Sequence, residues 1–154
     1  MATVFKPPQP PVYQDGIPVV FLAGSIDMGR AETWQARVEA ELADRDLILL
    51  NPRREDWDSS WVQSIENAAF RQQVVWELEG LERADWILMH FAAGSQAPIT
   101  LLELGLTAAS GRLIVACAPD YWRRGNIEVV CARYGLPLFT GLDMALAELG
   151  RRLA

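Results

Sequence analysis

Five short apolar runs alternate along this chain with segments in which apolar residues recur at helical spacing. The runs cover residues 18–23, 46–50, 85–91, 113–118 and 136–139. Apolar runs of this length, bounded by turn residues, are typical of strands that are buried on both faces. Strands that alternate with helices form parallel sheets with helices packed on both sides. The sequence therefore predicts a three-layer α/β domain with a five-stranded parallel sheet.

The segments between these runs predict helices, because their apolar residues return about every four positions. We expect the helices at about 31–43, 64–84, 98–109, 126–133 and 142–153. The connections are short, which favours the flavodoxin-like strand order 2-1-3-4-5. That order makes the first strand central and puts its loop, at Gly24-Ser25, where ligands bind in such sheets.

The start of the chain differs in composition from the rest. Pro7, Pro8, Pro10 and Pro11 predict an extended, polyproline-like arm over residues 1–17. We expect a single domain over residues 18–154. The 154-residue chain is 51% apolar and 22% charged, which is the composition of a globular domain with its own core.

Charge and composition argue against several classes of function. The net charge of −6 disfavours nucleic-acid binding, which needs clustered Lys and Arg. The single histidine, His90, excludes a multi-histidine metal site, and no cofactor is expected. No run approaches the roughly 20 apolar residues of a membrane span, and the first residues have no secretory apolar region. The two cysteines, Cys117 and Cys131, lack metal-type spacing. Cys117 ends an apolar run, so we expect it to be a buried thiol in a cytoplasmic protein.

A carboxylate within an apolar helix is the most informative candidate. Glu103 lies in Ile99-Thr100-Leu101-Leu102-Glu103-Leu104-Gly105, directly after the third expected strand and its loop. This position is the carboxyl edge of the sheet, and a carboxylate is costly to bury without a partner. Glu103 is therefore expected in a polar cleft or, alternatively, on the solvent side of an amphipathic helix.

A second acid lies late in the long expected helix. Glu77 follows Gln73 by four residues, so both side chains share one helical face beside an apolar stripe. From spacing alone, Glu77 is either a surface acid or a catalytic one.

Two loops at the same edge carry further candidates. Gly24-Ser25-Ile26-Asp27-Met28-Gly29-Arg30 lacks the spacing of a dinucleotide loop and the lysine of a P-loop. Its amides can hold a sugar or a phosphate, or it is an ordinary turn. Asn126 can hold a ligand hydroxyl or cap a helix. Three tryptophans can stack on a flat ring or pack in the core: Trp57, Trp61 and Trp76.

Three blocks of the sequence carry a resemblance to a known family. They are Val20-Phe21-Leu22-Ala23-Gly24-Ser25-Ile26, Gln73-Val74-Val75-Trp76-Glu77-Leu78-Glu79-Gly80-Leu81-Glu82-Arg83-Ala84-Asp85 and Leu102-Glu103-Leu104-Gly105-Leu106-Thr107-Ala108-Ala109-Ser110-Gly111-Arg112. Over about residues 18–140 the chain resembles the nucleoside 2-deoxyribosyltransferase superfamily. The third block is the most specific, because it resembles the nucleophile motif of that family. The first block also resembles the deoxynucleoside 5′-monophosphate N-hydrolase branch.

The resemblance implies a flavodoxin-like fold and a homo-oligomer, a dimer or larger. It implies that Glu103 is the nucleophile that attacks the anomeric carbon and that Glu77 is an acid that assists the base and sugar. Asn126 matches an amide that is often donated into the site of a neighbouring subunit. Substrate contacts are expected from six residues: Gly24, Ser25, Ile26, Asp27, Gln73 and Asn126. The implied partners are a nucleoside or nucleotide and a free nucleobase.

The chemistry of glycosidic cleavage fits two acids at one edge. The reaction passes through an oxocarbenium-like state that a carboxylate stabilises or traps covalently. Carboxylates about 5 Å apart suit a retaining route, and their like charges favour one protonated acid near neutrality. The expected function is transfer of the (2-deoxy)ribosyl group between nucleobases through an ester on Glu103. The alternatives are hydrolysis of nucleosides or their 5′-monophosphates, with Ser25 and Arg30 on the phosphate, and a non-catalytic nucleotide-binding module.

Two features differ from the resembled transferases. Those enzymes often carry an acid in the loop before the nucleophile, whereas this loop is Gly94-Ser95-Gln96-Ala97-Pro98. They also have an aromatic residue early in the first strand, where this chain has Val20 or Phe21 and no phenol. Both differences affect two steps of the expected reaction. These are the recognition of the base and the transfer of a proton to the leaving base.

Overall fold

The computed structural model describes residues 1–26, 33–54 and 58–154. Its centre is a parallel sheet in the order β1-β3-β2-β4-β5-β6. The strands are β1 (Thr3–Phe5), β2 (Val19–Gly24), β3 (Ile48–Leu50), β4 (Trp86–Phe91), β5 (Leu113–Cys117) and β6 (Leu138–Phe139). Without β1, this is the predicted 2-1-3-4-5 order, so the flavodoxin-like arrangement of the central strands is confirmed.

The prediction of five strands is wrong, because the sheet has six. The additional strand, β1, lies in the proline-rich segment and pairs with β3, with Thr3 opposite Ile48 and Phe5 opposite Leu50. It was missed because only three residues form it and prolines follow at once. Its pairing covers the edge of β3, which would otherwise expose unpaired backbone groups.

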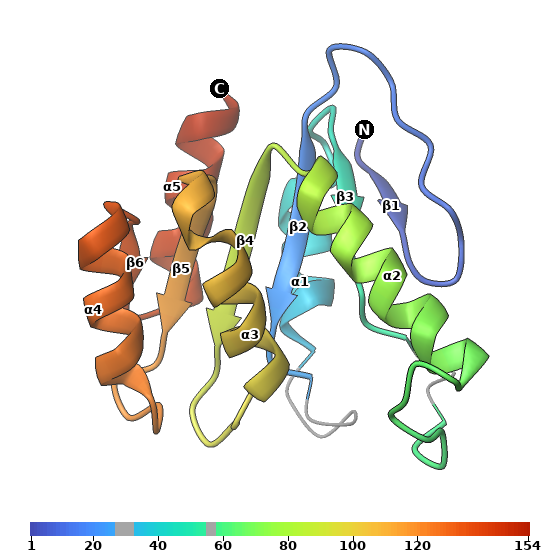
Figure 1. Cartoon of the computed structure of the whole chain (residues 1–154). Helices are drawn as coiled ribbons and strands as arrows, with labels where there is room; N and C mark the ends of the chain where they lie inside the picture. The colour runs from blue at the N-terminus through green and yellow to red at the C-terminus, as the bar shows by residue number, and fades with distance from the viewer. Residues whose placement is uncertain (27–32, 55–57) are drawn as a thin grey trace.

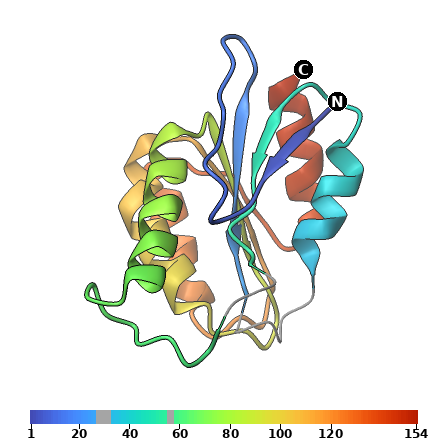
Figure 2. The same ribbon diagram turned by 90° about the vertical axis from the view of Figure 1, so that its right-hand side faces the viewer.

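Helices cover both faces of the sheet. Figure 2 shows α2, α3 and α4 on one side and α1 and α5 on the other. The helices are α1 (Trp34–Leu42), α2 (Ala68–Arg83), α3 (Pro98–Thr107), α4 (Arg124–Tyr134) and α5 (Leu142–Leu153), and a 3-10 turn, η2 (Ala108–Ser110), extends α3. Helix α2 begins later than predicted because Asn67 caps it, accepting a hydrogen bond from the Phe70 N–H at 3.0 Å.

Strand β2 is apolar throughout because its two faces lie in the two cores of the domain. Val19, Phe21 and Ala23 belong to the core under α2, α3 and α4, whereas Val20 and Leu22 belong to the core under α1 and α5. All five side chains are 0% exposed. Each large apolar side chain buried in this way contributes about 1.5–3 kcal/mol, so β2 anchors both halves of the domain.

The carboxyl ends of the strands share one edge, the lower edge in Figure 1, where the loops after β2, β3 and β4 begin. Gly24 ends β2 in a crowded position. A Cβ atom there would lie 2.5 Å from the His90 carbonyl oxygen and 2.5 Å from the Trp34 ring. Only glycine allows β2, β4 and α1 to approach this closely.

Candidate active site

Helix α3 turns its acid toward the sheet and its leucines toward solvent. Thr100, Glu103 and Leu104 lie on its buried face. Glu103 is 8% exposed, whereas Leu102 and Leu106 are each 58% exposed. The alternative of a solvent-facing Glu103 is therefore wrong, and the buried position needs a functional or structural reason.

Glu77 is held by a glutamine on the preceding turn of α2. The Gln73 Nε2 group donates to Glu77 Oε1 at 2.9 Å and to the Pro52 carbonyl oxygen at 3.0 Å. Because both acceptors are oxygens, the orientation of the Gln73 amide is fixed. The shared face predicted for Gln73 and Glu77 is confirmed, and Glu77 is partly buried rather than a solvated surface acid.

The two acids interact electrostatically across the space between α2 and α3. Burial raises the pKa of Glu77 to about 7, against a smaller opposing effect of the Gln73 hydrogen bond. Burial, together with a smaller effect of the negative charge of Glu77, raises the pKa of Glu103 to about 8. Glu77 is thus the first of the pair to ionise, and its charge then holds the proton on Glu103. Near neutrality the pair carries a single proton, as expected for two carboxyl groups at one site.

Hydrogen bonds fix Ser25, the residue that follows β2. Ser25 is 0% exposed, and its Oγ accepts a hydrogen bond from the Ala92 N–H at 3.1 Å. The Trp34 indole N–H donates to the Ser25 carbonyl oxygen at 3.2 Å. Gly24 is buried and Ile26 is partly buried. Asp27 and Arg30 lie outside the described residues.

The remaining candidates are less closely associated with the acids. Asn126 is exposed in the first turn of α4, whose cap is Arg123, so the capping alternative is wrong. Among the described residues, no hydrogen bond joins the Asn126 side chain to Glu77 or Glu103. Trp76 packs beside Phe21 in the core. Trp61 lies under the Arg54 guanidinium, and Trp57 is outside the described residues.

The loop after β3 belongs to this region, although no predicted site residue lies in it. Pro52 accepts the hydrogen bond from Gln73, and Arg53 and Arg54 follow directly. The sequence feature that could have indicated this loop is the pair of adjacent arginines shortly after a strand, at the edge where ligands bind.

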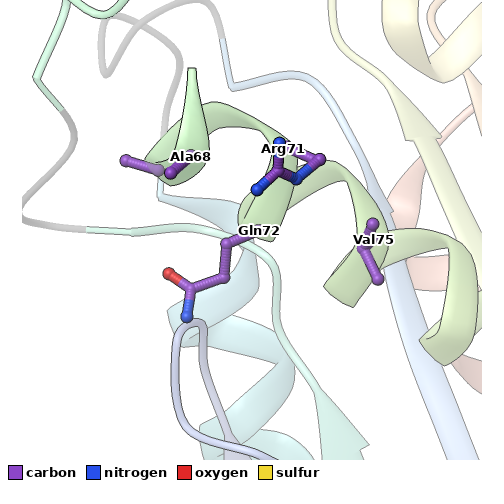
Figure 3. A pocket seen from close by; sticks show the side chains of 5 residues that line it. Ala68, Arg71, Gln72 and Val75 are labelled. Carbon is purple, nitrogen blue, oxygen red and sulfur yellow. The ribbon is translucent and has the colours of Figure 1, made fainter. Parts of the chain in front are cut away.

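A surface hollow on α2 lies away from these side chains. Figure 3 shows it beside the first turns of the helix. Its lining residues are Ala68, Ala69, Arg71, Gln72 and Val75. Neither acid contributes to this hollow, so it is not the candidate active site.

Within residues 1–26, 33–54 and 58–154, no helix is both long enough and apolar enough to cross a bilayer. In the same ranges, no group of three or more His, Cys, Asp or Glu residues is arranged to hold a metal ion.

Fold and site together define a class: a flavodoxin-like α/β domain with two interacting acids at the carboxyl edge of its sheet. Within that class the chain belongs to the nucleoside 2-deoxyribosyltransferase like family, whose model matches residues 17–121. The match spans β2 to β5 and includes both acids, so the resemblance seen in the sequence is confirmed. No curated protein matches the chain.

Proposed function

We propose that this protein is an enzyme that cleaves the N-glycosidic bond of (2-deoxy)nucleosides and transfers the (2-deoxy)ribosyl group to another nucleobase. The observation that carries the proposal is the burial of Glu103 beside Glu77, with both pKa values raised. Perturbed acids that face one another are typical of catalytic sites. Membership of the family supports the same chemistry.

In the proposed mechanism, the single proton of the pair, which Glu103 holds in the free protein, passes to Glu77 when the substrate binds. Glu103 then acts as the nucleophile in its ionised form while Glu77 carries the proton. A Glu103 oxygen bonds to the anomeric carbon as the carbon–nitrogen bond breaks, and Glu77 donates its proton to the leaving base. A nitrogen of the incoming base then attacks the same carbon, which releases the Glu103 carboxylate. The proton of that nitrogen returns to Glu77, so the enzyme is regenerated.

Gln73 is proposed as a positioning residue for Glu77. Its two donated hydrogen bonds fix the carboxyl group against the loop after β3. A donor to Glu77 stabilises the carboxylate, so the hydrogen bond makes Glu77 a stronger acid than burial alone would. This helps it release a proton to the base.

The proposal is tested by incubating the protein with 2′-deoxynucleosides, with and without free adenine or cytosine, and separating the products by chromatography. New nucleosides that appear only with added base support transfer. Free sugar in both reactions would instead establish hydrolysis, with water as the acceptor. Tight binding without any product would overturn catalysis and favour a nucleotide-binding module.

We also propose that the protein is a homo-oligomer that acts in the cytoplasm. The outer surface of α2, α3 and α4 carries an apolar face formed by Val75, Leu78, Ile99, Leu102, Leu106 and Val129. Apolar side chains grouped in this way are typical of protein interfaces. The thiols Cys117 and Cys131 are buried and free, which is consistent with a reducing compartment.

A further inference from the structure

The side-chain amide of Gln73 faces Glu77 in one of its two possible orientations. Its Nε2 group donates to Glu77 Oε1 at 2.9 Å, and its Oε1 atom is buried without a hydrogen-bond partner among the described residues. Glu77 does not by itself require this orientation, because a protonated carboxyl group can donate to an amide oxygen just as a carboxylate accepts from an amide N–H. The orientation therefore depends on another contact of Gln73.

The Pro52 carbonyl oxygen supplies that contact. It accepts a hydrogen bond from Gln73 Nε2 at 3.0 Å, and a carbonyl oxygen can only accept. Turning the Gln73 amide over would place two oxygens against each other at this point. The direction of the Pro52 carbonyl thus determines that Glu77 receives an N–H donor, which stabilises its ionised form.

The peptide unit that carries this carbonyl is held at its other end by Asn51. Peptide units are planar, and in the trans form the C=O and the following N–H point in opposite directions. The N–H of this unit belongs to Arg53 and donates to Asn51 Oδ1 at 2.9 Å, which closes a turn around Pro52. Asn51 is 2% exposed, and its own N–H donates to the Phe5 carbonyl oxygen at 3.0 Å. Rotation of the Pro52 carbonyl away from Gln73 would therefore break the hydrogen bond to Asn51 as well.

Glu39 orients the Asn51 amide in the same way. Asn51 Nδ2 donates to Glu39 Oε1 at 2.6 Å, and Lys6 Nζ lies 3.7 Å from the same oxygen. Because a carboxylate only accepts, Asn51 turns its Nδ2 group toward Glu39 and its Oδ1 atom toward the backbone of the loop. Glu39 lies on α1 and Glu77 on α2, and these helices cover opposite faces of the sheet in Figure 2. The contacts therefore run around the carboxyl end of β3, from one layer of helices to the other.

We propose that Asn51 and Glu39 are positioning residues of this site. Through the loop after β3 they hold the Gln73 amide with its N–H toward Glu77. The part that this plays in catalysis rests on the proposed function, whereas the effect on Glu77 itself requires no substrate.

The test is the pKa of Glu77 in the substrate-free protein. It is measured by NMR titration of isotope-labelled glutamate carboxyl groups in the Glu103→Gln background, where Glu77 titrates without its coupled partner, and Glu77→Gln identifies the signal. Asn51→Ala frees the loop, so the Gln73 amide can turn over and accept the proton of Glu77. The pKa of Glu77 should then rise by roughly 0.5 to 1, the effect of losing one hydrogen bond to the carboxylate.

Asn67→Ala is the matched control. Asn67 also accepts a hydrogen bond from a backbone N–H, that of Phe70 at 3.0 Å, but it caps the start of α2. Its loss should destabilise the protein and leave the pKa of Glu77 unchanged. A double-mutant cycle separates the proposed route from a general loosening of the fold. In a Gln73→Met background, Asn51→Ala should not change the pKa of Glu77 further, because the amide through which it acts is gone.

An unchanged pKa of Glu77 in Asn51→Ala, or an equal rise with and without the Gln73 amide, would overturn the proposal. If Asn51→Ala does not fold, Glu39→Ala replaces it and should also raise the pKa of Glu77, while Glu39→Gln keeps an acceptor for Asn51 and should restore the wild-type value. Loss of the Glu39 charge would by itself lower that pKa, so a rise identifies the route through Asn51, and no rise excludes it. If no nucleoside is cleaved, the proposed function fails, but the titrations still decide the role of Asn51 and Glu39.

Discussion

At the scale of single residues, the site depends on an acid that faces inward where its neighbours face outward. The helix around Glu103 is apolar, yet its leucines at 102 and 106 are exposed and Glu103 is buried. The sequence indicated an unusual carboxylate but could not decide its direction, because that depends on how α3 is rotated against the sheet. The interaction with Glu77 was predicted correctly. The contact of Gln73 with Pro52 was not, since it joins residues that no periodicity connects.

Replacement of Glu103 by glutamine should change how stability depends on pH. The pKa of Glu103 rises from 4.5 to about 8 on folding, so the folded state keeps a proton that the unfolded state releases. Wild-type stability should therefore fall as the pH rises from about 5 to about 9, by on the order of a few kcal/mol. Glu103→Gln should lose much of that dependence.

Urea unfolding of both proteins at several pH values measures the effect. The variant should also lose at least about a thousandfold in activity, as expected when a nucleophile is removed. Parallel pH dependences for the two proteins would show that Glu103 does not hold the proton.

Removal of the Gln73 amide should shift the pH–rate profile. The profile should be bell-shaped, with its limbs near the pKa values of the pair, about 7 and about 8. Gln73→Met removes the donor that lowers the pKa of Glu77, so the acidic limb should move to higher pH. Gln72→Met, on the exposed side of the same helix turn, is the control. If Gln73→Met lowers the rate but leaves the acidic limb of the pH–rate profile at the wild-type pH, Gln73 has only a structural role.

At the scale of elements, the segment before α3 decides where Glu103 lies. Ala97 precedes the helix with a left-handed φ of 45°, which is strained for a residue with a side chain. The Tyr121 hydroxyl donates to the Gln96 carbonyl oxygen at 2.5 Å and the Trp122 indole N–H donates to it at 3.0 Å. The sequence predicted a loop here but not its anchoring, because the donors come from the start of the next βα connection.

Loss of the Tyr121 hydroxyl should loosen this loop. Tyr121→Phe leaves the Gln96 carbonyl with one donor fewer, which should lower the free energy of unfolding by about 1 kcal/mol. The turnover rate should also fall, since the loop sets the position of α3. Tyr134→Phe, at an exposed position 45% accessible to solvent, should change neither quantity. Chemical unfolding and steady-state rates provide the readouts, and identical behaviour of the two variants would contradict the anchoring role.

At the scale of the whole molecule, the order of the central strands followed from short connections, but the edge strand did not. A three-residue strand such as β1 carries too little pattern to be recognised, and it forms only because β3 offers an open edge. The proposed assembly with other subunits likewise depends on the surface rather than on any motif. The apolar face of α2, α3 and α4 is the feature that predicts it.

A charge in the middle of that face should separate the subunits. Leu102→Glu places a carboxylate on the central helix of the face, where an apolar contact would have to bury it at a cost of several kcal/mol. Analytical ultracentrifugation should then show a smaller species than the wild-type protein. Met144→Glu alters a side chain of similar exposure on α5, 57% against 58%, on the opposite side of the sheet. It should leave the mass unchanged, and equal masses for all three proteins would place the interface elsewhere.

Both ends of the described chain lie at the amino edge of the sheet, at the top of Figure 1, whereas the loops after β2, β3 and β4 lie at the opposite edge. An affinity tag or a tether to a solid support, attached at either terminus, would therefore project away from the edge that carries the proposed active site. Immobilised protein should keep the access to substrate that it has in free solution.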